Sequence, residues 1–189
     1  MTMWNGNRHA GMQSTSESKD MLRGYIREIN DFPKAGVLFR DITPLLQNGK
    51  VFNDAISRIA SGFQYSDISS IACVESRGFI IGTALAGKLE CGVIPVRKKG
   101  KLPYKVCSET YDLEYGTDCL EMHADAISPG QRVLIVDDVL ATGGTAKAVV
   151  NLIKGMQGTI VCAAFLLELL DLKGRSKLEG YPVYSLLQY

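Results

Sequence analysis

The chain has 189 residues, 46% of them apolar, and its 21 Lys and Arg residues nearly balance its 20 Asp and Glu residues, which gives a formal net charge of +1. A chain of this length and composition can bury a sizeable core, so wholesale disorder is excluded. The near-neutral charge also removes the main sequence argument for nucleic acid or a membrane surface as a partner.

Cysteine and histidine usage is sparse. Five cysteines lie singly along the chain without a CxxC pair, and only two histidines, His9 and His123, are present. Neither a disulfide framework nor a zinc site has this pattern. The first twenty residues are polar, and no apolar run approaches the roughly 18–20 residues of a membrane span. These features predict a cytoplasmic protein with reduced thiols.

The N-terminal part begins with residues 1–15, which are small, polar and without periodicity, and which are expected to form a disordered tail before a single domain over residues 16–189. Apolar residues between Met21 and Ile29 recur at helical spacing, which predicts a helix that stops near Asn30. After a loop, Asn48 is placed to cap a second helix.

From residue 68 onward, apolar β-branched runs alternate with helical patterns. Such alternation is typical of βαβ units, so we expect an α/β fold with a mostly parallel twisted sheet flanked by helices. The expected strands cover residues 68–74, 92–96, 118–124, 132–136 and 160–167, the expected helices cover 78–89 and 144–154, and a long basic loop is expected over 97–110.

The segment 132–145 is the most informative part of the sequence. A buried strand is expected to deliver two adjacent acids, Asp137 and Asp138, at its carboxyl end, and a loop of small residues then leads directly into a helix. Ligands of open α/β sheets bind at this edge, and backbone amides at a helix N-terminus favour a phosphate. The expected phosphate loop consists of Ala141, Thr142, Gly143, Gly144 and Thr145.

Two carboxylates beside a phosphate loop would repel a bare anion, so the ligand must bring hydroxyl donors or a divalent cation. A phosphorylated ribose with free 2′ and 3′ hydroxyls meets that demand. The plainer alternative is a capped turn in which Asp137 and Asp138 are solvated charges at a strand end.

This segment resembles the phosphoribosyl-pyrophosphate motif of the type I phosphoribosyltransferases. Further segments resemble the members that use adenine, in the same chain order: residues 32–43, 75–79, 100–103 and 111–116. The similarity runs from about residue 21 to the C-terminus, with Val139 where such proteins often have Leu. It implies a small N-terminal base-binding hood, a mobile lid loop, and the conversion of adenine and 5-phospho-α-D-ribose 1-diphosphate (PRPP) to AMP and diphosphate in purine salvage.

The resemblance also implies residue roles. Asp137 and Asp138 match ligands of the ribose hydroxyls, and Glu114, on the lid, matches a proposed general acid/base. The positions that match diphosphate-binding residues are Arg77, Arg97, Lys98 and Lys101. The positions that match the adenine-binding strip are Leu38, Phe39 and Arg40. Mg²⁺ is expected to bind mainly through PRPP and diphosphate, with no protein ligand assigned, and the chain is expected to form a homodimer.

Three alternative functions have some support in the sequence. A non-catalytic PRPP-binding regulator could keep the phosphate loop, and the same transfer could serve another nucleobase. Residues 82–89 also fit a nucleotide-binding P-loop up to Leu89, which stands where the Mg²⁺-binding Ser or Thr belongs. That stretch falls inside an expected helix, so nucleotide hydrolysis is disfavoured.

Overall fold

The computed structural model of the chain describes residues 16–112 and 116–189. The chain forms two compact units, one ending at Ala55 and the other beginning at Ile56. The expected tail over residues 1–15 lies outside the described residues. The expectation of one domain over 16–189 stays a prediction.

The N-terminal unit begins with helix α1 (Ser16–Arg23), followed by strand β1 (Arg27–Ile29). β1 pairs antiparallel with β2 (Phe39–Asp41). The prediction of one helix up to Asn30 was therefore wrong. The helix ends beside Gly24, and pairing of the following residues with a strand ten residues further on overrides their helical spacing.

Two helices, α2 (Thr43–Gln47) and α3 (Gly49–Ser61), follow β2. The side-chain oxygen of Asn48 accepts a hydrogen bond from the backbone N–H of Val51 at 3.3 Å. This bond satisfies one of the free amides in the first turn of α3, so the predicted cap is confirmed.

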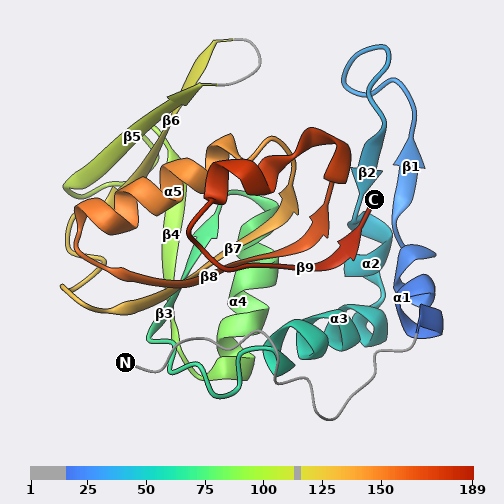
Figure 1. Cartoon of the computed structure of the whole chain (residues 1–189), viewed down its shortest axis with the longest axis horizontal. Helices are drawn as coiled ribbons and strands as arrows, with labels where there is room; N and C mark the ends of the chain where they lie inside the picture. Colours follow the sequence, from blue (N-terminus) through green and yellow to red (C-terminus); the bar gives the residue numbers. More distant parts are fainter. Residues whose placement is uncertain (1–15, 113–115) are drawn as a thin grey trace. The chain divides into compact units, whose positions relative to one another are not determined.

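A seven-stranded sheet in the order β5-β6-β4-β3-β7-β8-β9 is the basis of the second unit (Figure 1). The strands from β4 to β9 in this order run parallel to their neighbours, while β6 pairs antiparallel with both β4 and β5. The predicted mostly parallel sheet is thus confirmed. The strands are β3 (Ser70–Val74), β4 (Gly92–Lys98), β5 (Val106–Asp112), β6 (Thr117–His123), β7 (Arg132–Leu140), β8 (Thr159–Glu168) and β9 (Val183–Gln188).

Helices cover both faces of this sheet. α4 (Arg77–Leu89) connects β3 to β4 on one face, and α5 (Gly144–Gly155) connects β7 to β8 on the other (Figure 1). Two short 3₁₀ helices, η1 (Leu170–Leu172) and η2 (Gly174–Leu178), lie between β8 and β9. The P-loop-like residues 82–89 lie inside α4, so they form no phosphate loop.

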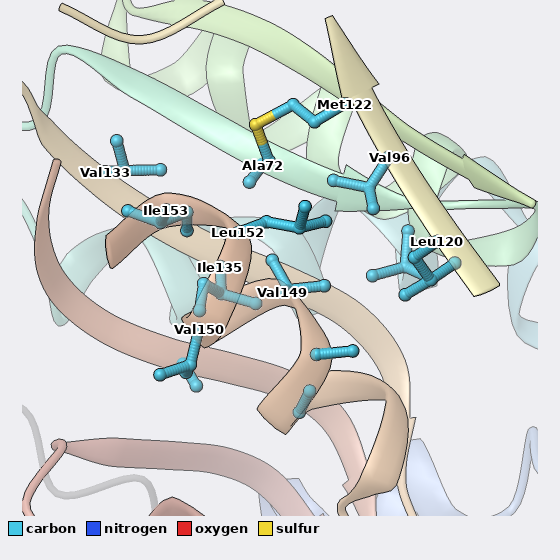
Figure 2. Close-up of a cluster of buried hydrophobic side chains, with 14 of the residues drawn as sticks. Ala72, Val96, Leu120, Met122, Val133, Ile135, Val149, Val150, Leu152 and Ile153 are labelled. Atoms are coloured by element: carbon cyan, nitrogen blue, oxygen red, sulfur yellow. The ribbon is translucent and has the colours of Figure 1, made fainter. Parts of the chain in front are cut away.

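The main core lies between α5 and the sheet. Figure 2 shows Val149 and Leu152 of α5 among side chains of several strands, including Ile135 and Met122, and these residues are buried. Each buried side chain of this size contributes roughly 1.5–3 kcal/mol relative to an exposed one. This packing fixes the start of α5 relative to the end of β7.

The expected loop over 97–110 was wrong. β4 continues to Lys98, and β5 begins at Val106. β5 has few strongly apolar residues, and its pairing with β6 is what makes it a strand. β9 was not predicted at all.

All five cysteines are free thiols, as expected. No helix in the described part of the chain is long and apolar enough for a bilayer crossing.

Candidate active site

The carboxyl ends of β3 and β7 form a topological switch point. β3 and β7 are parallel neighbours, but the chain leaves β3 through α4 toward β4 and leaves β7 through α5 toward β8. The two connections therefore diverge to opposite sides and opposite faces of the sheet. Crevices at such points are the usual ligand sites of open α/β sheets.

The predicted phosphate loop lies at this point. β7 ends at Leu140 and α5 begins at Gly144, so three residues make the turn. Gly143 has a φ of +78°, a conformation that suits glycine, and it precedes the free amides of the first helical turn.

The loop surrounds a cavity of about 60 Å³. This volume suits a single phosphate group and is well below the roughly 300–1,000 Å³ of sites that enclose a whole drug-sized ligand. The structure brings all five predicted loop residues together here. The cavity is lined by Asp137, Val139, Leu140, Ala141, Thr142, Gly143, Gly144, Thr145, Ala146 and Phe165.

The two acids lie within β7 rather than after it, because the strand runs to Leu140 and not to residue 136 as expected. Successive strand residues point to opposite faces; Asp138 is buried, and Asp137 is partly buried. The Nε atom of Arg77, the first residue of α4, lies 2.6 Å from Oδ2 of Asp138. The residue predicted to bind diphosphate thus contacts a residue predicted to bind ribose.

Asp137 faces the start of α4. Its Oδ1 atom accepts the backbone N–H of Asp138 at 2.8 Å, and a Cβ atom placed on Gly78 would lie 2.8 Å from the same oxygen. Burial of the carboxyl group, with the nearby charge of Asp138 as a second cause, raises the pKa of Asp137 well above its ordinary value.

The predicted cations of the basic segment are held by acids. Arg97 Nε and Lys101 Nζ lie 3.0 and 2.5 Å from the two carboxylate oxygens of Glu75, and Lys98 Nζ lies 3.0 Å from Asp118. Burial alone would raise the pKa of Glu75, but the hydrogen bonds from Lys101 and Arg97 outweigh it and lower that pKa.

Sequence reasoning missed the roles of Glu75 and Asp118. Glu75 lies between β3 and Arg77, in the segment 75–79 that resembles the family, and its position next to the predicted diphosphate site was the available signal. Asp118 is a β6 residue whose pairing with Lys98 depends on the β4–β6 contact, for which no local pattern existed.

The segment expected to form a lid lies in the sequence between β5 and β6, and its residues 113–115 lie outside the described residues. The hydroxyl oxygen of Tyr111, near the end of β5, lies 3.5 Å from Oγ1 of Thr145. One arm of the β5–β6 hairpin therefore contacts the phosphate-loop end of α5. Glu114, the predicted general acid/base, lies outside the described residues.

The predicted base-binding strip belongs to the N-terminal unit. Phe39 and Arg40 are in β2, and Leu38 precedes them with 39% of its surface exposed. Phe39 packs edge-to-face on Phe32 with ring centroids 5.2 Å apart, and Arg40 forms an ion pair with Glu28. Both side chains are thus fixed within their own unit.

A wider depression of about 690 Å³ is also present in the N-terminal unit. Its lining holds one lysine but no carboxylate or thiol, so it offers little chemistry beyond binding. It is lined by Tyr25, Pro44, Gln47, Asn48, Gly49 and Lys50.

Known proteins match this arrangement closely. The family model of the phosphoribosyl transferase domain matches residues 42–186. An adenine phosphoribosyltransferase from Brachyspira hyodysenteriae is 57% identical over 168 residues, which cover 89% of this chain and 99% of that protein.

Solved structures agree. The crystal structure of adenine phosphoribosyltransferase from Thermoanaerobacter pseudethanolicus has a TM-score of 0.88 at 48% identity, and the match covers 90% of this chain and 99% of that one. The enzyme from Saccharomyces cerevisiae, solved with adenine and an imino-altritol bisphosphate, has a TM-score of 0.85 at 38% identity and covers 92% and 100%.

A domain match of this length identifies the class: the chain has the fold of a phosphoribosyltransferase, an enzyme that transfers a pentose. The relatives identify the family within this class, because adenine phosphoribosyltransferases are more than 50% identical to this chain over nearly their whole length. The chain belongs to the adenine phosphoribosyltransferase family.

Proposed function

We propose that the chain transfers the phosphoribosyl group of PRPP to adenine, with AMP and diphosphate as products, and so serves purine salvage. The observation that carries this proposal is the phosphate-sized cavity of residues 141–145 beside Asp137 and Asp138 at the switch point. In the reaction, the C1′–O bond to diphosphate breaks, its electron pair leaves with diphosphate, and N9 of adenine bonds to C1′.

The phosphate loop holds the 5′-phosphate. Amides at the start of α5 and the hydroxyl groups of Thr142 and Thr145 are suitable donors for its oxygens. Asp137 and Asp138 accept hydrogen bonds from the ribose hydroxyls. The negative charge of Asp138 also favours the cationic character that the sugar acquires as the C1′–O bond breaks.

The cations of the site bind the leaving diphosphate. Arg77, Arg97, Lys98 and Lys101 each have a carboxylate partner within the chain, so binding requires an exchange of partners. The planar fork of Arg77 suits bidentate contact with phosphate oxygens.

Mg²⁺ enters this scheme with the substrate. The described residues contain no cluster of three or more His, Cys, Asp or Glu side chains that could hold a metal ion. When Mg²⁺ is bound, diphosphate oxygens would be its main ligands, and the ion would supply charge neutralisation there.

The base is held by the strip Leu38, Phe39 and Arg40. Phe39 offers an aromatic face to the purine, and backbone groups of the strip read its edge. Glu114 accepts the proton that N9 loses, or returns one to the leaving group. Closure of the lid that carries Glu114 excludes water from the reactive C1′ centre.

The expected homodimer and cytoplasmic location remain proposals based on the family resemblance. A dimer would let the basic strand β4 and the segment after it approach a neighbouring active site. Light scattering during size-exclusion chromatography tests the dimer: a mass near 20.6 kDa, that of one chain, would contradict it.

The experiment that tests the function is incubation of the protein and Mg²⁺ with labelled PRPP and one free base at a time. Labelled AMP is expected with adenine, and no nucleotide with hypoxanthine, guanine or uracil. Product with another base alone would support the alternative base specificity. Binding of PRPP without any product would support the non-catalytic regulator.

A further inference from the structure

Two glycines that are distant in the sequence, Gly143 of the phosphate loop and Gly174 of η2, lie back to back. A Cβ atom on Gly174 would overlap the carbonyl oxygen of Ala141 and lie 3.1 Å from the backbone nitrogen of Gly143. In the reverse direction, a Cβ atom on Gly143 would overlap the carbonyl oxygen of Gly174. The start of η2 and the phosphate loop are therefore in direct backbone contact.

The residue after Gly174 ties η2 to the sheet. Arg175 contacts both carboxylate oxygens of Glu168, through Nε at 2.5 Å and Nη2 at 2.8 Å, and its Nη1 donates to the backbone oxygen of Val183 at 3.0 Å. Ser185 and Gln188 of β9 donate to the same carboxylate at 2.7 and 3.1 Å. The Glu168 carboxylate thus accepts four hydrogen bonds from three side chains.

Glu168 lies directly beside the residue that precedes the phosphate loop. It is the last residue of β8 and pairs with Leu140, the last residue of β7. The next residue, Leu169, donates its backbone N–H to the Leu140 oxygen at 2.9 Å. Glu168, whose carboxylate holds η2, therefore lies at the end of β8, next to the end of β7 where the phosphate loop begins.

The Glu168 side chain is only 3% exposed, yet its hydrogen bonds favour the ionised form. Burial alone would raise the pKa of Glu168, but the hydrogen bonds from Arg175, Ser185 and Gln188 outweigh it and lower that pKa. A bidentate pair of this kind has a defined geometry. Because Arg175 follows Gly174 directly, the pair with Glu168 also fixes the position of Gly174.

We propose that Glu168 and Arg175 are positioning residues for the sugar phosphate. By pressing the backbone of Gly174 against Ala141 and Gly143, they hold the loop amides in the arrangement that receives the phosphate before substrate arrives. This inference rests on the proposed function for the identity of the ligand. It assigns to the η2 segment, which contributes no residue to the cavity lining, a part in substrate affinity.

The first test uses Arg175→Lys, which keeps the positive charge but loses the bidentate fork. The KM for PRPP is expected to rise about tenfold, since small misplacements of binding groups are costly, while the KM for adenine changes less than about twofold. Gly174→Ala, which forces the two backbones apart, is expected to act in the same direction. Lys177→Ala, an exposed residue of the same η2 helix, is the matched control and should leave both constants unchanged.

The second test separates positioning from general stability and from the proposed function. Hydrogen–deuterium exchange of the protein without substrate should show faster exchange in Arg175→Lys for the peptide with residues 141–145, but not for one with core strand β3. Equal acceleration of both peptides, no acceleration, or equal rises in both KM values would overturn the inference.

If Arg175→Lys does not fold, Ser185→Ala removes one donor of the same carboxylate and is expected to give a smaller change in the same direction; wild-type exchange in this variant would contradict the proposal. Failure of the wild type to form AMP would refute the proposed function. The hydrogen–deuterium exchange experiment needs no substrate, so it would still test whether Arg175 and Glu168 order the loop.

Discussion

The Nε atom of Arg77 lies 2.6 Å from Oδ2 of Asp138, which joins the first residue of α4 to the strand that leads into the phosphate loop. Only 8% of the Asp138 side chain is exposed, against 38% for Arg77. Arg77 can therefore turn toward a ligand at the surface, whereas Asp138 remains fixed. A substrate that offers hydroxyl groups to Asp138 and phosphate oxygens to Arg77 can replace this ion pair with two sets of hydrogen bonds.

Arg77→Lys should therefore weaken PRPP binding more than adenine binding. Lysine keeps the charge but presents no fork, and the loss of one charge-assisted hydrogen bond corresponds to roughly 1.5–3 kcal/mol. We expect the KM for PRPP to rise about tenfold or more. Steady-state kinetics with each substrate varied in turn provide the measurement, and equal effects on both substrates would count against a diphosphate role.

Asp138→Asn should reduce turnover without unfolding the chain. Asparagine has the same shape and keeps one acceptor, but it removes the negative charge that faces the developing sugar cation. A decrease in kcat of about 10²-fold is expected, comparable to removing one preorganised electrostatic group. Circular dichroism should show a wild-type fold. Full activity in this variant would exclude the ribose role.

Gly78→Ala should lower both stability and activity. The new Cβ atom would lie 2.8 Å from Asp137 Oδ1 and 3.2 Å from the backbone oxygen of Val136, so α4 or β7 must shift at a cost of ~1–3 kcal/mol. Gly87→Ala, in the same helix with nothing within 4 Å, is the matched control. It should stabilise the protein by about 0.5–1 kcal/mol. Urea unfolding of both variants tests the contrast.

The raised pKa of Asp137 predicts how stability depends on pH. The folded chain holds this proton more tightly than the unfolded chain, so the contribution of Asp137 is most favourable below its ordinary pKa of 3.8 and is lost as pH rises through the higher folded value. The Asp137→Asn variant lacks this titration. Above pH 3.8 the wild type should lose stability relative to the variant, by at most about 1.4 kcal/mol per pH unit.

Parallel denaturation of the wild type and Asp137→Asn across a pH series gives this difference directly. The comparison cancels the titration of groups that behave alike in both proteins. A constant difference over the whole series would show that the Asp137 carboxyl titrates normally in the folded chain.

Local patterns were sufficient for the part of the site built from adjacent residues. The apolar run of β7, the small residues after it and the start of α5 follow one another directly, so the strand–loop–helix arrangement was predictable from residues 132–145 alone. The fold class, a mostly parallel sheet flanked by helices, was also predictable, because most of the parallel strands alternate with helical segments.

Features that depend on pairing between distant segments were not predictable. β1 forms a strand only because β2 lies beside it, and β5 only because β6 does. The backbone contact between Gly174 and Gly143 likewise depends on where η2 returns to the sheet. No local signal marks Gly174 for this contact, since its neighbours read as an ordinary surface turn.

The pairing of the cations at the switch point has a consequence for selectivity among anions. Arg77, Arg97, Lys98 and Lys101 are balanced by three carboxylates of the chain itself, so little net positive field is directed at solvent. Free inorganic phosphate, which has no sugar hydroxyls to engage Asp138, gains little by displacing these partners. We therefore expect these ion pairs to make the site discriminate against common cellular anions that lack sugar hydroxyls.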